Sequence, residues 1–167
     1  MSEDLPEEKN IRVREIMTKE VISVYPDTNV GQIARLMSAY SISGLPVVDH
    51  SDRVVGVVTE RDMIMRNTRF KLPTYIVFFE SVIPLETRSH YRDRLEHSLG
   101  TTASEIMSEP AVTVTPEATI EELAEIMIGR GMNPIPVVEN GRLVGIVSRA
   151  DIIRLMGIEL DSEDQAS

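Results

Sequence analysis

A ten-residue stretch occurs twice in this chain, and this duplication restricts the possible folds more than any other feature of the sequence. Residues 53–62 read RVVGVVTERD, and residues 142–151 read RLVGIVSRAD. In each copy an apolar run with one glycine ends at a hydroxyl residue, and an aspartate follows three positions later. The apolar run predicts a buried strand. The hydroxyl residue marks the start of a helix, whose first amides have no partner within the helix.

The duplication extends beyond this stretch. Segments 15–17, 24–26 and 46–49 return ninety positions later as segments 105–107, 114–116 and 136–139. After the turn that precedes the glycine strand the offset falls to 89, because one residue is lost at Asn140-Gly141, a preferred two-residue hairpin turn. We therefore expect the second and third strands of each copy to form a hairpin.

Each copy also contains the pattern of an amphipathic helix before its hairpin. Apolar residues recur at i, i+3, i+4 and i+7, as Val30, Ile33, Ala34 and Met37 in the first copy and as Ile120, Leu123, Ala124 and Met127 in the second. Asn29 can cap the first helix, and Thr119 with Glu122 forms a capping box on the second. The order of elements predicts two β-α-β-β-α units, each preceded by a short lead-in turn or helix. A unit of about fifty residues buries little apolar surface alone, so we expect the two to pack about an approximate two-fold axis.

The glycine strand and the hydroxyl residue after it can be interpreted in two ways. The glycine lets a ligand or backbone approach closely, and a helix start attracts anions. However, Thr59-x-x-Asp62 and Ser148-x-x-Asp151 are also capping boxes, which satisfy helix amides and need no ligand. The occurrence of two such copies favours a binding site.

Each unit resembles a cystathionine-β-synthase (CBS) domain, and the pair resembles a Bateman module. The resemblance covers residues 13–65 and 103–155, and Pro134 replaces Gly44 in the second copy. The motifs that carry it in the first copy are Ile16-Met17-Thr18, Val24-x-Pro26, Gly44-Leu45-Pro46-Val47-Val48-Asp49 and Gly56-Val57-Val58-Thr59-x-x-Asp62. The resemblance implies an α/β (α+β) fold and a regulatory module that binds AMP, ADP, ATP or an S-adenosyl compound.

The resemblance also implies which residues bind the ligand. Asp62 and Asp151 would hold ribose, and Thr59 and Ser148 would orient ribose or phosphate. The adenine slot would be lined by Ile42 and Ser43 in one copy and by Met132 and Asn133 in the other. One cleft would combine Ser148 and Asp151 with Lys19, Val21, Ile42 and Ser43, and the other would combine Thr59, Arg61 and Asp62 with Ala111, Met132 and Asn133.

The two clefts need not bind equally. Arg149 flanks the first, and Pro134 in place of Gly44 changes a slot wall. For Val21, Ile42 and Met132, packing in the core is as good an interpretation as ligand contact.

Composition excludes several other classes of function. With a net charge of -10, the chain lacks the basic face that binds nucleic acid. Cysteine is absent, and His50, His90 and His97 show no metal-ligand spacing. No nucleophile–base pair is visible, so we expect no enzyme activity and no required cofactor. The acidic N-terminus and the lack of a long apolar run argue against a signal peptide and a membrane span, and for a cytoplasmic protein.

The chain is predicted to have five parts: a flexible acidic arm (1–10), repeat 1 (11–65), a helical insertion (66–102), repeat 2 (103–156) and an acidic tail (157–167). Residues 75–82 are predicted to be helical despite their β-branched and aromatic content. The insertion either caps the module or pads an oligomer interface, or one of Arg88, Arg92 and Arg94 reaches a ligand phosphate.

Two functions follow from these observations. The first is a sensor of an adenosyl ligand that signals to a separate partner protein. The alternative is a structural or oligomerisation module without a ligand. One core does not need all the apolar side chains of the chain, and the surplus ones are Met63, Met65 and Met156. Exposed apolar side chains mark interfaces, so we expect a homodimer.

Overall fold

The computed structural model describes residues 11–67, 75–78, 81–84 and 101–165. The chain divides into two compact units. We call residues 22–111 the first-repeat unit, and residues 1–21 together with 112–167 the second-repeat unit. The boundaries differ from those of the sequence repeats. The segments that lead into the two repeats, residues 11–21 and 103–111, each belong to the unit that contains the hairpin of the other repeat. We call these the lead-in segments.

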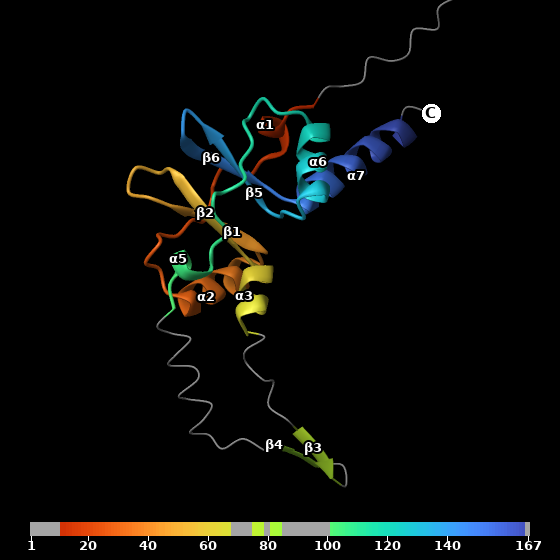
Figure 1. The fold of residues 1–167 in the computed structure, drawn as a ribbon. Helices are drawn as coiled ribbons and strands as arrows, with labels where there is room; N and C mark the ends of the chain where they lie inside the picture. Colours follow the sequence, from red (N-terminus) through yellow and green to blue (C-terminus); the bar gives the residue numbers. More distant parts are fainter. Residues whose placement is uncertain (1–10, 68–74, 79–80, 85–100, 166–167) are drawn as a thin grey trace, which may run out of the picture. The chain divides into compact units, whose positions relative to one another are not determined.

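The first-repeat unit contains a two-stranded antiparallel sheet with helices around it (Figure 1). Its elements are α2 (Val30–Tyr40), β1 (Gly44–Val48), β2 (Val54–Thr59), α3 (Glu60–Asn67) and α5 (Ala103–Ile106). The Asn29 side chain accepts a hydrogen bond from the Gly31 amide and caps α2 as predicted. Ser41 ends this helix in the left-handed conformation, with φ of 52°. The predicted hairpin is confirmed, and its register pairs Gly44 with Thr59.

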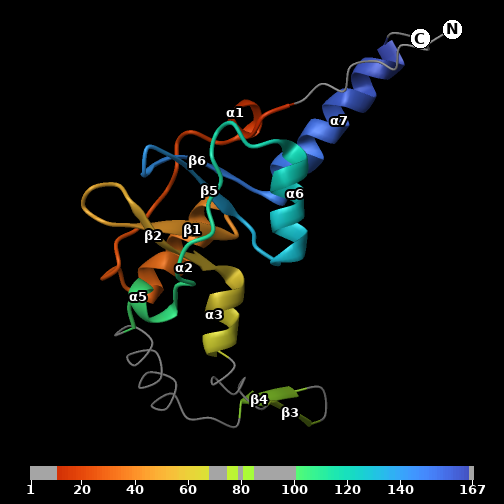
Figure 2. The same ribbon diagram turned by 45° about the horizontal axis from the view of Figure 1, so that its top comes forward.

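The second-repeat unit repeats this arrangement (Figure 2). Its elements are α1 (Val13–Ile16), α6 (Ile120–Gly129), β5 (Ile135–Glu139), β6 (Arg142–Val147) and α7 (Arg149–Gln165). The predicted capping box of Thr119 and Glu122 is present on α6. Asn140 and Gly141 both have positive φ values, 51° and 79°, as the tight turn of a two-residue hairpin requires. The mixed fold class is confirmed, and the two-fold packing of the repeats stays a prediction.

The first strand predicted in each repeat is reduced to a single bridge residue. Val24 donates to the Pro46 carbonyl at 3.0 Å and accepts from Val48 at 2.8 Å. Val114 makes the equivalent parallel bridge to Val137. On the other edge of each hairpin, a lead-in segment pairs in the antiparallel sense.

The lead-in segments complete the two sheets. Thr18 and Ile146 exchange two backbone hydrogen bonds of 2.9 Å. Ser108 and Val57 exchange two of 2.9 and 3.2 Å. These bonds satisfy edge groups that a lone hairpin would leave exposed, which explains why residues 11–21 belong to the second-repeat unit.

Each unit has its own apolar core. In the first-repeat unit the buried members are Val24, Ile33, Met37, Leu45, Val47, Val58 and Ala103. In the second-repeat unit they are Val13, Val114, Leu123, Met127, Ile135, Val137 and Val147. The helix residues predicted to face inward at i+3 and i+7 are therefore buried in both copies, because they lie on the helix face that contacts the sheet.

The prediction of a helix over residues 75–82 was wrong. Residues Tyr75–Phe78 form β3 and residues Ser81–Pro84 form β4, and the two strands pair antiparallel, with Tyr75 opposite Pro84 and Phe78 opposite Ser81. Six of these eight residues are β-branched or aromatic, all but Ser81 and Pro84, and such residues favour strands. The charged segment that was predicted to follow, with Arg88, Arg92 and Arg94, lies outside the described residues.

The segment predicted as an acidic tail is helical over most of its length, since α7 continues to Gln165. No proline occurs between residues 149 and 165. The one glycine, Gly157, costs about 1 kcal/mol in a helix, which is too little to end it.

The glycine of each glycine strand makes room for a methionine of the lead-in segment. A Cβ atom on Gly56 would lie 2.8 Å from Cγ of Met107 and would overlap its sulfur. A Cβ atom on Gly145 would lie 2.6 Å from the Sδ atom of Met17. The close approach predicted at these glycines is therefore made by a side chain of the protein itself.

We expect Gly56→Ala to lower the free energy of unfolding by about 1–3 kcal/mol, because the added methyl group overpacks the site against Met107. In a Met107→Ala chain the same change should cost much less, which is the coupling expected of residues in contact. Urea unfolding of the four chains measures both effects. Gly157→Ala is the control: nothing lies within 4 Å of its added Cβ, and it should stabilise α7. Equal costs of Gly56→Ala in both backgrounds would contradict this account.

A second prediction concerns the turn of the first hairpin. Asp49 Oδ1 accepts hydrogen bonds from the Ser51 and Arg53 amides at 2.8 and 3.0 Å. The hydrogen bond from the Arg53 amide, followed by that from the Ser51 amide, has the largest effect in holding the pKa of Asp49 below its ordinary value. The stability that a lowered carboxyl pKa contributes is present when the pH is above the ordinary pKa. It is lost as the pH falls through the pKa of the folded state.

We therefore expect the turn to loosen only as the pH drops below about 4. The amide chemical shifts of Ser51 and Arg53 should titrate together with the Asp49 carboxyl. In Asp49→Asn this titration should disappear. A midpoint at or above the ordinary aspartate value would argue against the two hydrogen bonds.

Candidate functional site

The candidate site is the junction where each glycine strand ends and a helix begins. In the first-repeat unit β2 ends at Thr59 and α3 begins at Glu60. In the second-repeat unit β6 ends at Val147 and α7 begins at Arg149, with Ser148 between them. The aspartate three residues after the hydroxyl lies in the first turn of each helix.

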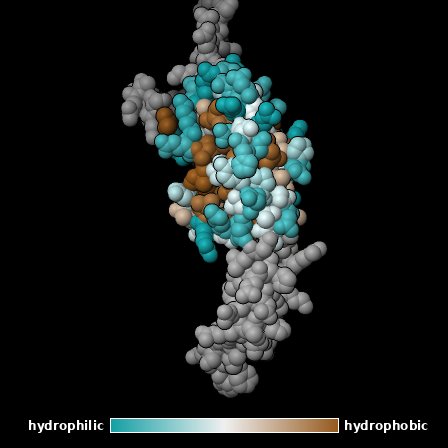
Figure 3. Space-filling model, turned by 90° about the vertical axis from the view of Figure 1, so that its left-hand side faces the viewer, coloured by the Kyte–Doolittle hydropathy of each residue, from teal (hydrophilic) through white to brown (hydrophobic). Residues whose placement is uncertain are grey.

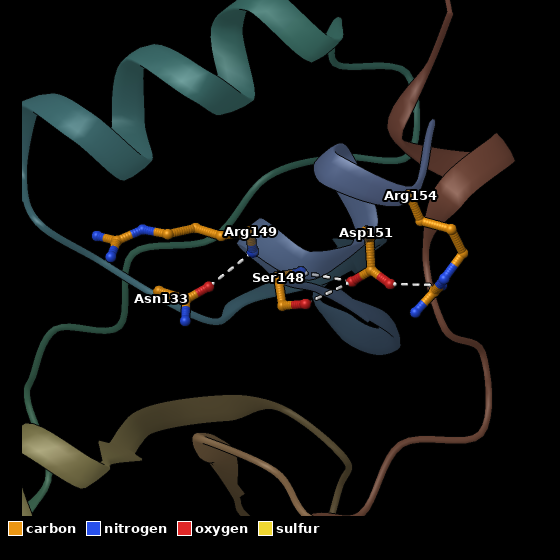
Figure 4. A network of polar contacts seen from close by, with 5 residues as sticks. All are labelled: Asn133, Ser148, Arg149, Asp151 and Arg154. Carbon is orange, nitrogen blue, oxygen red and sulfur yellow. Dashed lines mark hydrogen bonds and ion pairs between the residues drawn. The ribbon is translucent and has the colours of Figure 1, made fainter. Parts of the chain in front are cut away.

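Asp151 is held by three hydrogen-bond donors (Figure 4). The Ser148 amide and hydroxyl donate to its Oδ2 atom at 2.7 and 2.8 Å. The Arg154 guanidinium donates to Oδ1 at 3.1 Å. Asp151 is only 7% exposed, and a buried carboxylate requires such compensation.

Asp62 has a similar set of donors with one substitution. The Thr59 amide and hydroxyl donate to its Oδ2 atom at 2.8 and 2.7 Å. The third donor is the Ser108 hydroxyl, 3.3 Å from Oδ1. The Oδ1 atom of Asp151 thus contacts a cation, whereas the Oδ1 atom of Asp62 contacts a neutral hydroxyl from a lead-in segment.

These contacts are those of the capping interpretation. In the first junction the bonding is reciprocal, since the Asp62 amide also lies 3.4 Å from the Thr59 hydroxyl. Both aspartates therefore stabilise a helix start. A carboxylate accepts about four hydrogen bonds in total, so capping leaves each aspartate with some capacity for a ligand.

The segments predicted as adenine slots meet the first amide of each helix. The Asn133 side chain accepts from the Arg149 amide at 2.8 Å, as Figure 4 shows. In the other unit the Ser43 carbonyl accepts from the Glu60 amide at 2.9 Å. A side chain thus does in one repeat what the main chain does in the other, and each arrangement satisfies one helix amide that lacks an internal partner.

The predicted site residues are divided between the two units. The first-repeat unit contains Ile42, Ser43, Gly44, Thr59, Arg61, Asp62 and Ala111. The second-repeat unit contains Lys19, Val21, Met132, Asn133, Pro134, Ser148, Arg149 and Asp151. Within the units the structure joins Thr59 to Asp62, Ser148 to Asp151, and Asn133 to Arg149. Clefts that draw on both units stay predictions.

The side chains of these residues differ in exposure. Lys19, Arg61 and Arg149 are exposed, whereas Gly44 and Pro134 are buried. Ile42 and Met132 are partly buried against the two cores. The core interpretation therefore holds for Ile42 and Met132, and their exposed parts remain open to a ligand.

Two residues of the junctions were missed in the sequence. Arg154 follows Asp151 by three residues on one helix, and this spacing brings oppositely charged side chains together, so a local signal existed. Ser108 lies 46 residues from Asp62 and no local pattern connects them. Only the pairing of the lead-in segment with β2 brings this hydroxyl to the junction.

Two further observations concern metal ions and membrane spans in the described residues. Among them no group of three or more histidine, aspartate or glutamate side chains could hold a metal ion. No helix in the described ranges is both long and apolar enough to cross a membrane.

Comparison with known proteins gives a consistent result. The family model described as "CBS domain" matches residues 13–67 and 103–158. The uncharacterized protein MJ1426 of Methanocaldococcus jannaschii is 28% identical over 154 residues, which cover 86% of this chain and 90% of that protein. The inosine-5'-monophosphate dehydrogenase of the same organism is 30% identical over 141 residues, 84% of this chain but only 22% of the enzyme.

Solved structures share the fold. The CBS-domain containing protein ATU1752 from Agrobacterium tumefaciens has a TM-score of 0.67 at 26% identity, covering 87% of this chain and 99% of that one. The CBS domain pair of MJ0100, in complex with 5'-methylthioadenosine and S-adenosyl-L-methionine, has a TM-score of 0.68 at 23% identity, covering 89% and 98%. CBSX2 in complex with AMP has a TM-score of 0.65 at 21% identity, covering 90% and 98%.

Proposed function

The chain belongs to the CBS domain family, and from this premise we propose that it is a non-catalytic regulatory module that binds an adenosyl ligand. The observation that carries the proposal is the duplicated junction, in which a hydroxyl residue presents an aspartate at the start of a helix. The complexes of the MJ0100 domain pair with S-adenosyl compounds and of CBSX2 with AMP support this choice of ligand class.

The chemistry of the junction suits a nucleoside. Ribose carries two neighbouring hydroxyl groups, and an ionised carboxylate can accept a hydrogen bond from each. Hydrogen bonds to charged groups contribute about 1.5–3 kcal/mol each. Because Thr59 and Ser148 already hold the carboxylates in place, little side-chain entropy is lost when a ligand binds.

The proposed clefts keep the composition expected from the sequence. One combines Asp151, Ser148 and Arg149 with Lys19 and Val21 of the lead-in segment and with the Ile42–Ser43 wall. The other combines Asp62, Thr59 and Arg61 with Ala111 and with the Met132–Asn133 wall, and Gly44 and Pro134 lie next to the walls. The ligand is AMP, ADP, ATP or an S-adenosyl compound, and the bound module signals to a partner protein.

Asp62→Ala and Asp151→Ala should each weaken ligand binding at one site about ten- to a hundred-fold, because the ribose contact is lost. Each should also lower the free energy of unfolding by about 1–3 kcal/mol, because an amide and a hydroxyl lose their acceptor. Calorimetric titration with AMP and S-adenosylmethionine, and thermal melting of the same samples, measure the two effects.

Asp62→Asn and Asp151→Asn are the matched variants that keep the shape and remove the charge. Asp27→Ala, an exposed aspartate outside the junctions, controls for the change in net charge. Unchanged affinity in both alanine variants, with lowered melting, would mean that the two aspartates are caps only. Wild-type melting that does not rise with millimolar ligand would also argue against the proposal, since a ligand at 100 times its Kd adds about 2.7 kcal/mol.

A structural module without a ligand is the second candidate, and one observation favours self-association in either case. Apolar side chains reach the surface of the described part of the chain (Figure 3). Met65 and Met156 are 61% and 54% exposed, and Ile153 on α7 is 67% exposed. Met63 packs partly buried against the core, so the prediction that it exceeds what one core needs was wrong for this residue. Exposed apolar side chains grouped on helices mark interfaces.

We therefore propose a homodimer, and we expect sedimentation at tens of micromolar to give about twice the monomer mass of 18.7 kDa. Ile153→Glu combined with Met156→Glu should shift the equilibrium to monomer, because two charges would be buried in the interface. Thr115→Glu, at an exposed position outside α7, should leave the mass unchanged. A wild-type monomer at these concentrations would contradict the dimer.

A further inference from the structure

We propose that Arg154 is a specificity-determining residue of the Asp151 junction and that it makes this junction select adenosyl ligands that carry a phosphate group over uncharged nucleosides. The inference rests on the proposed function, because it requires that ribose binds Asp151. Its basis is the contact of the Arg154 Nη1 atom with the Oδ1 atom of Asp151, at 3.1 Å.

A count of donors shows why this contact matters to a ligand. Asp151 already accepts from the Ser148 amide, the Ser148 hydroxyl and Arg154. A carboxylate accepts about four hydrogen bonds. With the two ribose hydroxyls added to these three donors, the carboxylate would have five. One existing donor must leave when both hydroxyls bind.

Arg154 is the donor placed to leave. The Ser148 amide is fixed by the backbone at the end of β6, and both Ser148 bonds are shorter than that of Arg154. The Arg154 side chain is 67% exposed, whereas that of Asp151 is 8% exposed. The guanidinium can therefore move toward solvent, while the carboxylate stays buried.

The cost of this exchange depends on the charge of the ligand. An uncharged nucleoside replaces a cation by neutral donors and leaves a buried carboxylate without a counter-charge. A ligand with a phosphate group brings an anion beside the released guanidinium, which binds phosphate with paired hydrogen bonds. One ion pair is then exchanged for another, and the net cost falls.

The first repeat has a methionine at the position of this arginine. The residue equivalent to Arg154 is Met65, and the Oδ1 atom of Asp62 contacts the neutral Ser108 hydroxyl at 3.3 Å. Displacing the neutral Ser108 hydroxyl breaks a hydrogen bond and not an ion pair. We therefore infer that the Asp62 junction discriminates less between charged and uncharged adenosyl ligands than the Asp151 junction does.

The test compares AMP with adenosine, which differ by the phosphate group alone. Calorimetric titration of both into a full-length Asp62→Ala chain isolates the Asp151 junction. The ratio of the adenosine Kd to the AMP Kd is the readout. Arg154→Met, which installs the residue of the first repeat, should lower this ratio about tenfold because one ion pair is lost. This change corresponds to about 1.4 kcal/mol. Arg154→Lys should keep most of it.

Arg154→Gln keeps a hydrogen-bond donor and removes the charge, so it should lower the ratio as Arg154→Met does and serves in its place if the methionine variant does not fold. Arg142→Met removes a different exposed arginine of the same unit and should leave the ratio unchanged. Conversely, Met65→Arg in an Asp151→Ala chain should raise the ratio at the Asp62 junction.

The outcomes separate the two proposals. If the wild-type chain binds none of AMP, ADP, ATP, S-adenosylmethionine and adenosine, the proposed function fails and this inference fails with it. If it binds S-adenosylmethionine but neither AMP nor adenosine, this inference alone fails. If it binds AMP and adenosine, and Arg154→Met leaves the ratio unchanged, the proposed function stands and Arg154 serves only as a structural ion-pair partner of Asp151. A ratio that falls in Arg154→Met and Arg154→Gln but not in Arg142→Met supports the inference.

Discussion

The pairing of each lead-in segment with a glycine strand is the interaction on which the rest of the structure depends. Thr18 pairs with Ile146 and Ser108 pairs with Val57, and a methionine packs over the strand glycine beside each pair. A two-stranded hairpin is marginally stable alone, so the added backbone bonds and the buried methionine complete each unit. The same pairing brings Ser108 to the Asp62 carboxylate.

The aspartate of each junction stabilises the fold and is also the proposed ligand contact. Its Oδ2 atom serves the amide and hydroxyl of the preceding Thr59 or Ser148, which is the bonding of a helix cap. Its Oδ1 atom faces a more replaceable donor. The two oxygen atoms can thus perform separate tasks, and the cap fixes the orientation in which the other oxygen meets a ligand. Capping and binding, which appear as alternatives in the sequence, are compatible in the structure.

The two repeats differ where a ligand would detect the difference. Asn133 uses its side chain where Ser43 uses its carbonyl, and Arg154 stands where the other repeat has Met65. The shared residues maintain the hairpin and the cap, because both are needed for each unit to fold. Residues beside them can vary at low cost to stability, so the two proposed sites can differ in selectivity.

Local patterns in the sequence determined the hairpins, the amphipathic helices, the caps by Asn29 and Thr119, and the junctions with Asp62 and Asp151. Each of these depends on residues a few positions apart, whose periodicity or hydrogen-bonding geometry is visible in one segment. The helix predicted over residues 75–82 is the exception. There an apolar run too short to show a period was assigned to the wrong element, although its β-branched residues favoured strands.

Only the tertiary structure decided which lead-in segment completes which sheet, that Met107 and Met17 occupy the space beside the glycines, and that Ser108 donates to Asp62. These contacts join residues that are 46 or more positions apart. Their partners are chosen by the edge groups and the space that a folded hairpin leaves open, and neither exists until the hairpin has formed. The sequence could place an aspartate at each helix start by itself, but which donors surround that aspartate depended on packing between distant segments.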